Sequence, residues 1–80
     1  MAVEDARQRR AVHHELTRRY VDFSKVDVSV VHGVCYLRGV MTQLRTHPEV
    51  NLDHEAEVIQ KVLIRVQGIR SVVWDVRTVQ

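Results

Sequence analysis

The chain has 80 residues, with 12 basic and 10 acidic side chains and a formal net charge of +2. This length lies below that at which chains divide into domains, so it predicts one small domain over residues 1–80, with little room for a deep catalytic cleft. The small net charge argues against the strongly basic class of nucleic-acid-binding domains, and an apolar share of 45% argues against a disordered chain.

The first ten residues, MAVEDARQRR, predict neither a signal peptide nor a membrane span. They are charged and lack a run of roughly 7–15 apolar residues, and no later stretch approaches the ~18 apolar residues of a span. We therefore expect a cytoplasmic chain as written, or an envelope-associated one if it is a fragment of a longer protein.

A first helix is predicted from Glu4 to Tyr20, a stretch without Pro or Gly. Val12, Leu16 and Tyr20 recur every four residues, which gives the helix one apolar face. Asp5 and Arg9 continue that face toward the N-terminus. The start of the helix is therefore expected to project past the core or to meet something polar.

A β-hairpin is predicted from Lys25 to Met41, because VDVSV at 26–30 alternates and His32-Gly33 separates two β-rich runs. Two central residues that end in Gly suit a type I′ turn, which needs a positive φ at both. This turn sets the register. Val26, Val28 and Val30 then face Gly39, Leu37 and Cys35 on the core side, while Asp27 opposes Arg38 and Ser29 opposes Tyr36 on the other. The single cysteine, Cys35, is expected to be a buried, inert thiol.

Residues 42–53 form a long polar connector, which is either a functional loop or a tolerated insertion. A second helix is predicted from Glu55 to Gln67, capped by Asp53 and ended by Gly68 at its C′ position. A third strand is predicted over Ile69–Val79, beside either the first or the second strand. The inward side chains of these two elements are expected to be Ala56, Ile59, Val62, Leu63 and Val66 on the helix, and Val72, Trp74, Val76 and Thr78 on the strand.

The predicted order of helix, strand, strand, helix and strand, together with the glycine positions, resembles the BON domain, named from bacterial osmotic-stress and nodulation proteins. The similar stretches are VSVVHGVCYLRGV at 28–40 and GIRSV at 68–72. Gly33 corresponds to the hairpin-turn glycine, Leu37 to an inward leucine, Gly39 to the glycine at the end of the second strand, and Gly68-Ile69 to the pair that ends the second helix. His32 stands where the family has Asn or Asp, and the connector is longer than in the family.

This resemblance implies a two-layer αββαβ sandwich, with both helices on one face of a three-stranded sheet. It also implies binding without catalysis, to phospholipid surfaces or to other proteins.

The outer face of the sheet is the preferred candidate binding surface. Its apolar members are expected to be Val31, Val34, Tyr36, Val40, Val73 and Val79. The two edges of a three-stranded sheet could also pair with another copy. The alternative is that Asp27, Arg38, Asp75 and Arg77 keep this face hydrated and the chain monomeric.

The first helix carries a second candidate surface, formed by Arg7, Arg10, His14 and Arg18 at helical spacing opposite the apolar face. This surface suits an anionic membrane or an acidic protein patch, although a hydrated helix face is the ordinary interpretation.

The sequence predicts no catalytic residue, metal site, cofactor or small-molecule substrate. Five histidines show no metal-ligand spacing, and no nucleotide-binding glycine loop occurs. RNA binding is the third choice, because the three glycines never form the GxxG loop of KH domains. The predicted function is protein–protein interaction or homo-oligomeric self-assembly through the sheet face or edge, and the alternative is peripheral binding to a phospholipid surface.

Overall fold

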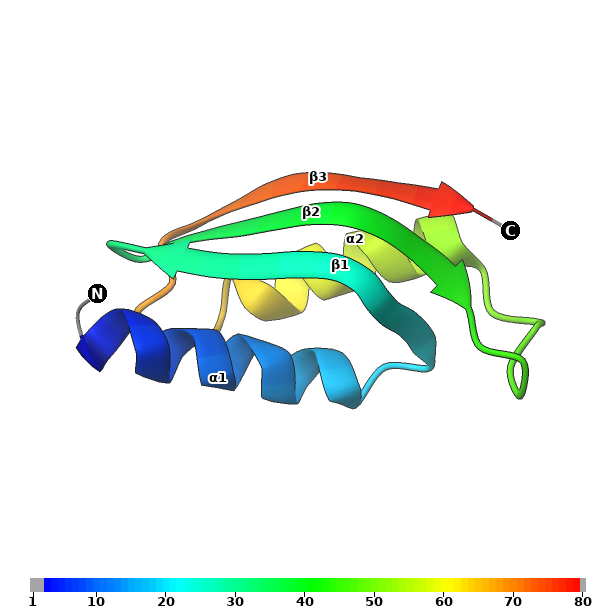
Figure 1. Cartoon of the computed structure of the whole chain (residues 1–80), viewed down its shortest axis with the longest axis horizontal. Coiled ribbons are helices and arrows are strands. Elements are labelled where there is room, and N and C mark those ends of the chain that lie inside the picture. Colours follow the sequence, from blue (N-terminus) through cyan, green and yellow to red (C-terminus); the bar gives the residue numbers. More distant parts are fainter. Residues whose placement is uncertain (1–2, 80) are drawn as a thin grey trace.

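The structure is a computed structural model that describes residues 3–79, and it has two helices and a three-stranded mixed sheet. The elements follow in the order α1 (Val3–Thr17), β1 (Val21–Val31), β2 (Val34–Gln43), α2 (Leu52–Leu63) and β3 (Ser71–Val79). Both helices lie on the same side of the sheet (Figure 1). The predicted α+β class is confirmed, and the element order is the predicted one.

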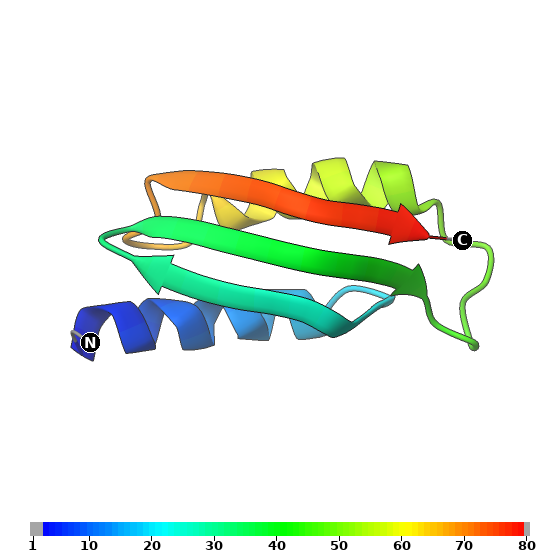
Figure 2. The same ribbon diagram turned by 45° about the horizontal axis from the view of Figure 1, so that its top comes forward.

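The central strand of the sheet is β2, which pairs antiparallel with β1 and parallel with β3. The connection from β2 through α2 to β3 is therefore a crossover that returns the chain to the same end of the sheet. Figure 2 shows the three strands side by side, with the helices behind them. The position of the third strand, which the sequence left open, is thus beside β2.

The hairpin has the predicted register, with Val26, Val28 and Val30 paired to Gly39, Leu37 and Cys35. His32 has a φ of 51° and Gly33 a φ of 80°, as a type I′ turn requires.

Both strands of this hairpin are longer than predicted, because β1 begins at Val21 and β2 continues to Gln43. The register shifts between Asp22 and Lys25. Gly39 pairs with Val26 beside this irregularity and has a φ of 135°, and a Cβ there would collide with the carbonyl oxygen of Lys25. The prediction that Gly39 ends the second strand is wrong, because it lies inside β2 where the two backbones approach closely.

Helix α1 ends at Thr17, earlier than the predicted Tyr20. The amides of Arg18 and Arg19 donate to carbonyls only three residues back, and the Thr17 hydroxyl donates to the His14 carbonyl oxygen at 2.7 Å. These short-range bonds tighten the last turn and stop the helix. Tyr20 is consequently 61% exposed instead of continuing the apolar face, and its ring stacks on His47 with a centroid distance of 4.4 Å.

Helix α2 begins at Leu52 and ends at Leu63, so both predicted ends are wrong. Its N-cap is Asn51, whose side-chain oxygen accepts from the amide of His54 at 3.0 Å, and Asp53 lies within the first turn instead. After Leu63 the chain forms turns with three-residue hydrogen bonds up to Ile69. Gly68 has a φ of 90° in these turns and does not occupy the helix C′ position.

The connector is shorter than the predicted 42–53 and consists of two consecutive turns. The amide of His47 donates to the Leu44 carbonyl, and that of Val50 donates to the His47 carbonyl. The side chain of Gln43 donates to the Val50 carbonyl oxygen at 2.7 Å, which ties the connector to the end of β2.

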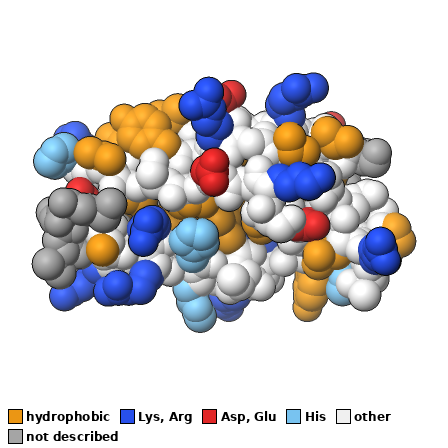
Figure 3. Space-filling view, in the orientation of Figure 1, with side chains coloured by type: hydrophobic (Ala, Val, Ile, Leu, Met, Phe, Trp, Pro, Cys, Tyr) orange, Lys and Arg blue, Asp and Glu red, His pale blue; other side chains and the backbone are white. Residues whose placement is uncertain are grey.

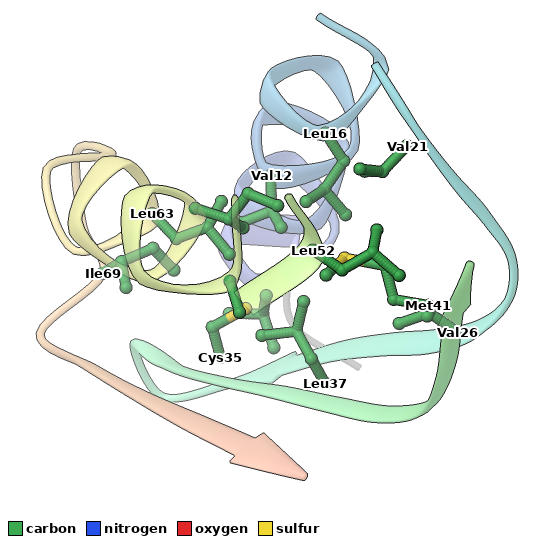
Figure 4. Close-up of a cluster of buried hydrophobic side chains, with 13 residues drawn as sticks. Val12, Leu16, Val21, Val26, Cys35, Leu37, Met41, Leu52, Leu63 and Ile69 are labelled. Carbon is green, nitrogen blue, oxygen red and sulfur yellow. The ribbon is translucent and has the colours of Figure 1, made fainter. Parts of the chain in front are cut away.

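The core lies between the inner face of the sheet and the two helices (Figure 4). Cys35, Leu37 and Met41 point from β2 toward α1 and α2, and each is 1% exposed or less. Val72, Trp74, Val76 and Thr78 alternate with exposed residues as predicted, although these side chains of β3 are only partly buried. Within residues 3–79, no helix or strand covers the outer face of the sheet (Figure 1).

Candidate functional site

The outer face of the sheet is built from residues that pair across the three strands. At the hairpin end, Val31 pairs with Val34, and Val34 pairs with Ser71. The next row, which we call the tyrosine row, is Ser29, Tyr36 and Val73. Alternation places these side chains opposite the buried Val30, Cys35 and Leu37, and so away from the core.

Two charged rows follow along the same face. The acidic row is Asp27, Arg38 and Asp75, in which Nε of Arg38 lies 3.9 Å from Oδ2 of Asp75. The basic row is Lys25, Val40 and Arg77. The last row, at the far end, is Asp22, Thr42 and Val79. Along the strands the face therefore reads apolar, negative on both outer strands, positive on both outer strands, and then a mixed row in which Val79 is the apolar member.

Four of the six predicted interface residues are well exposed: Val31 is 47% exposed, Tyr36 43%, Val73 44% and Val79 46%. Val34 and Val40 are half-buried. The structure places all six on one face, as predicted, but the charged rows divide them into two groups. Figure 3 shows this division, with hydrophobic side chains at both ends of the strand layer and charged ones between them.

The sheet edges are the other part of this predicted surface. In residues 3–79 no strand lies on the outer side of β1 or of β3. The Thr78 hydroxyl, on β3, donates to Oδ1 of Asp53 at 3.0 Å, which links this edge strand to the first turn of α2.

The predicted basic surface is only partly continuous. Arg7, Arg10 and His14 are exposed on α1, and basic side chains cover this helix in Figure 3. Arg18 lies beyond the last helical residue, and its guanidinium is 3.9 Å from the carboxylate of Glu15. Glu15 therefore places a carboxylate beside the C-terminal end of this surface.

A polar contact at the start of α1 holds the hairpin turn. Oδ1 of Asp5 accepts from the amide of His32 at 3.2 Å, so this face of the helix meets a polar group as expected. Gln8, and not the exposed Arg9, is the buried neighbour of Asp5: it is 7% exposed, and its Oε1 has no hydrogen-bond partner in the described structure. Its position four residues before Val12 was the available signal, and it was missed.

Gln8 also lines a shallow groove between α1 and the turns after α2, together with Arg7, Ala11, Val66 and Gln67. A second hollow over Glu15, Val62 and Arg65 adjoins it at Val66.

The only cysteine supplies no reactive thiol. Cys35 is fully buried, and burial raises the pKa of its thiol to about 11, so it stays protonated near neutral pH. A nucleophilic or metal-binding cysteine requires the thiolate.

The remaining polar side chains form no cluster with recognisable chemistry in the described part of the chain. Among residues 3–79, no three His, Cys, Asp or Glu side chains gather where they could hold a metal ion. No helix there is both long and apolar enough to cross a membrane. What the surface offers is one sheet face with exposed valines, a tyrosine and ordered charges. No family model matches the chain, and neither does any curated protein or solved structure.

Proposed function

We propose that this chain is a non-enzymatic protein-binding module that docks through the outer face of its sheet. The observation that carries the proposal is the exposure of Val31, Tyr36, Val73 and Val79 on one face. Single apolar side chains on a surface are ordinary, but several on one face are typical of surfaces that bind proteins. A central tyrosine adds a side chain that is enriched where interfaces bury most of their energy.

A BON-type fold is part of this proposal. The αββαβ order, the positive φ of Gly33 and the buried Leu37 agree with the resemblance of residues 28–40 to that family. Gly39 and Gly68 depart from it, because neither ends the element that the resemblance assigns to it. The resemblance supports binding without catalysis, to a protein or to a phospholipid surface.

The second candidate function is binding to an anionic surface through α1, favoured by the exposure of Arg7, Arg10 and His14. Membrane-surface helices combine such cations with an apolar face that enters the lipid. The apolar face of α1 is instead used by the core, where Val12 is fully buried and Leu16 is 3% exposed. We therefore place this function second.

Site-specific photo-crosslinking in cells of the native host tests the docking face. A photoreactive amino acid in place of Val73 is expected to give a discrete adduct with a protein. The matched control carries the same amino acid in place of His13, which is exposed on α1, and is expected to give none.

Two outcomes would count against the face. Adducts of equal yield from both positions, or none from Val73, would overturn the proposal. Docking along the edge of β1 or β3 would instead protect edge amides from hydrogen exchange while leaving Tyr36 open to nitration. Tyr20 is the internal reference for that labelling, because it is exposed outside the sheet face.

A further inference from the structure

We propose that the partner of the outer face is a second copy of this chain, bound face to face about a two-fold axis that runs across the strands between the acidic and basic rows. This inference rests on the proposed function and names its partner. Its basis is the order of charges that the strand register produces.

A two-fold axis in this position exchanges the two charged rows. It reverses the direction of the strands but keeps each strand over its own counterpart in the second copy. Asp27 then lies over Lys25 of the second copy, and Asp75 over Arg77 of the second copy. Because the contact is symmetric, each of these pairs occurs twice, and the acidic row of each copy faces the basic row of the other.

The alternative axis, parallel to the strands, is unfavourable. It would place β1 over β3, so that Asp27 faces Asp75 and Lys25 faces Arg77. Like charges opposed across an interface disfavour association, and groups removed from water there have no partner. The charge order therefore selects between the two ways in which this sheet can face a copy of itself.

Moving the crosswise axis toward the hairpin is also unfavourable. With the axis on the tyrosine row, Val31 would face Asp27 and Val34 would face Arg38 of the second copy. Neither Asp27 nor Asp75 would then meet a basic side chain of the second copy, so both carboxylates would lose water without gaining a cation across the interface. Only the axis between the two charged rows pairs opposite charges on both outer strands.

The same arrangement accounts for the divided apolar surface. With the axis between the charged rows, the tyrosine row lies over the row that contains Thr42 and Val79. Val73 then meets Val79 of the second copy, and Tyr36 meets Thr42. Val73 and Val79, which the charged rows separate within one chain, thus come into contact between two chains on both sides of the charged centre, and Ser29 lies over Asp22.

The size of the face sets the strength of this dimer. A three-stranded face of nine-residue strands, at ~3.3 Å per residue and ~4.8 Å between strands, covers about 400 Å² per copy. Two such faces bury less than the ~1,200–2,000 Å² of a standard stable interface, so the dimer is expected to be weak and concentration-dependent. The charges then act mainly on orientation and specificity.

Two double variants with the net charge of the wild type test the arrangement. The same-strand variant, Lys25→Glu with Asp27→Lys, exchanges charges within β1, and the proposed axis still pairs opposite charges. The cross-strand variant, Lys25→Glu with Asp75→Lys, exchanges charges between β1 and β3. The axis then sets Asp27 against a second carboxylate at position 25, and Arg77 against a second cation at position 75. Both variants put one lysine beside Arg38 and one glutamate beside Val40. The cross-strand variant also removes the Asp75 carboxylate that lies 3.9 Å from Arg38, so the melting temperatures of both dilute variants have to be compared.

Sedimentation velocity over roughly 10 µM to 1 mM protein measures the association. The same-strand variant is expected to dimerise like the wild type, and the cross-strand variant to show about a tenfold or greater rise in dissociation constant. Equal melting temperatures of the two dilute variants would exclude unfolding as the cause.

Three results would overturn the inference: a cross-strand variant that dimerises as well as the same-strand one, a dimer insensitive to both changes, or a wild type that stays monomeric throughout. If Val73 nevertheless crosslinks to a different protein, the proposed function stands and only the identity of the partner fails. If Val73 yields no protein adduct, both fail.

Discussion

The backbone conformation of the two residues at the tip of the hairpin determines both the turn and its contact with the chain before β3. His32 and Gly33 both have positive φ, and a Cβ on Gly33 would lie 2.7 Å from the carbonyl oxygen of Gly68. The Gly33 carbonyl accepts from the amide of Arg70 at 2.8 Å. Turn conformation and tertiary contact therefore both depend on glycine at this position.

We expect Gly33→Val to lower the free energy of unfolding by about 2 kcal/mol or more, because a β-branched residue is strained at positive φ and also meets Gly68. His32→Asn should leave stability unchanged or raise it by a few tenths, since Asn adopts this conformation more readily. Urea unfolding measures both. A valine variant as stable as the wild type would refute this account of the turn.

Neighbouring residues on β2 provide a second comparison, because Leu37 is 1% exposed and Tyr36 is 43% exposed on the opposite face. Leu37→Ala should cost ~2–5 kcal/mol of unfolding free energy through lost burial and the cavity left behind. Tyr36→Ala should cost the monomer much less. Thermal melts of dilute protein give the comparison. Equal losses of stability in the two variants would contradict the observation that Leu37 points into the core and Tyr36 points out.

The side of the sheet on which each side chain lies was largely predictable where apolar and polar residues alternate along a strand. A two-residue turn and period-two spacing determine every hairpin pair, from Val26 with Gly39 to Val30 with Cys35. The helical spacing of Gln8, four residues before Val12, places it on the buried side of α1, but the sequence does not show what covers it. Its burial depends on the turn at Gly68, which approaches α1 from a distant part of the chain.

At the scale of elements, one ion pair joins the end of α1 to the start of α2. Arg19 donates from Nε and Nη2 to the two carboxylate oxygens of Glu55, at 3.0 and 2.9 Å. This hydrogen bond, with the charge of Glu55, raises the pKa of Arg19 against the opposing effect of burial. The Glu55 side chain is 12% exposed, so the pair is better shielded from water than a surface pair.

A double-mutant cycle with Arg19→Ala and Glu55→Ala should give a coupling of about 1 kcal/mol, because two-point guanidinium–carboxylate contacts are the stronger kind. The control cycle uses Arg18 and Glu15, whose single 3.9 Å contact is exposed and should contribute about 0.3 kcal/mol or less. Chemical denaturation of the proteins in both cycles gives the two values. Equal couplings would show that burial and geometry add nothing to the Arg19 pair.

The ends of the helices were the least predictable part of the fold. Asn51 and Asp53 are both good N-cap residues, so the sequence pattern could not choose between them. The apolar spacing from Val12 through Tyr20 likewise favoured a longer α1. The burial of Leu52 in the core decided the start of α2, whereas local hydrogen bonds from Thr17, Arg18 and Arg19 ended α1 before Tyr20.

At the scale of the whole molecule, the basic side of α1 and the outer face of the sheet are separate surfaces, and this permits an independent test. We expect Arg10→Glu with Arg18→Glu to leave self-association and the melting temperature nearly unchanged, because both side chains are exposed away from the core. Sedimentation at two salt concentrations gives the first quantity. The same variant should remove any salt-sensitive binding of the wild type to anionic vesicles. Loss of self-association in this variant would show that α1 is the docking surface.

The whole-molecule arrangement was predictable up to the placement of β3. Alternation and helical periodicity indicated the order of elements and the inner face of each strand. Both edges of the hairpin could accept another strand, and local patterns do not choose between them. The crossover through α2 decides this, since a strand that follows such a helix joins its predecessor in parallel.

That placement also affects how the domain is completed during its synthesis. The strand β3 is the last element of the domain to be made, yet it pairs along the whole length of the central strand, joining Cys35 to Val72 and Leu37 to Trp74. Until it emerges, the edge of β2 has no strand beside it, and an unpaired backbone edge is a feature that leads partly made chains to aggregate. The nine residues of β3 therefore close the exposed edge of the central strand.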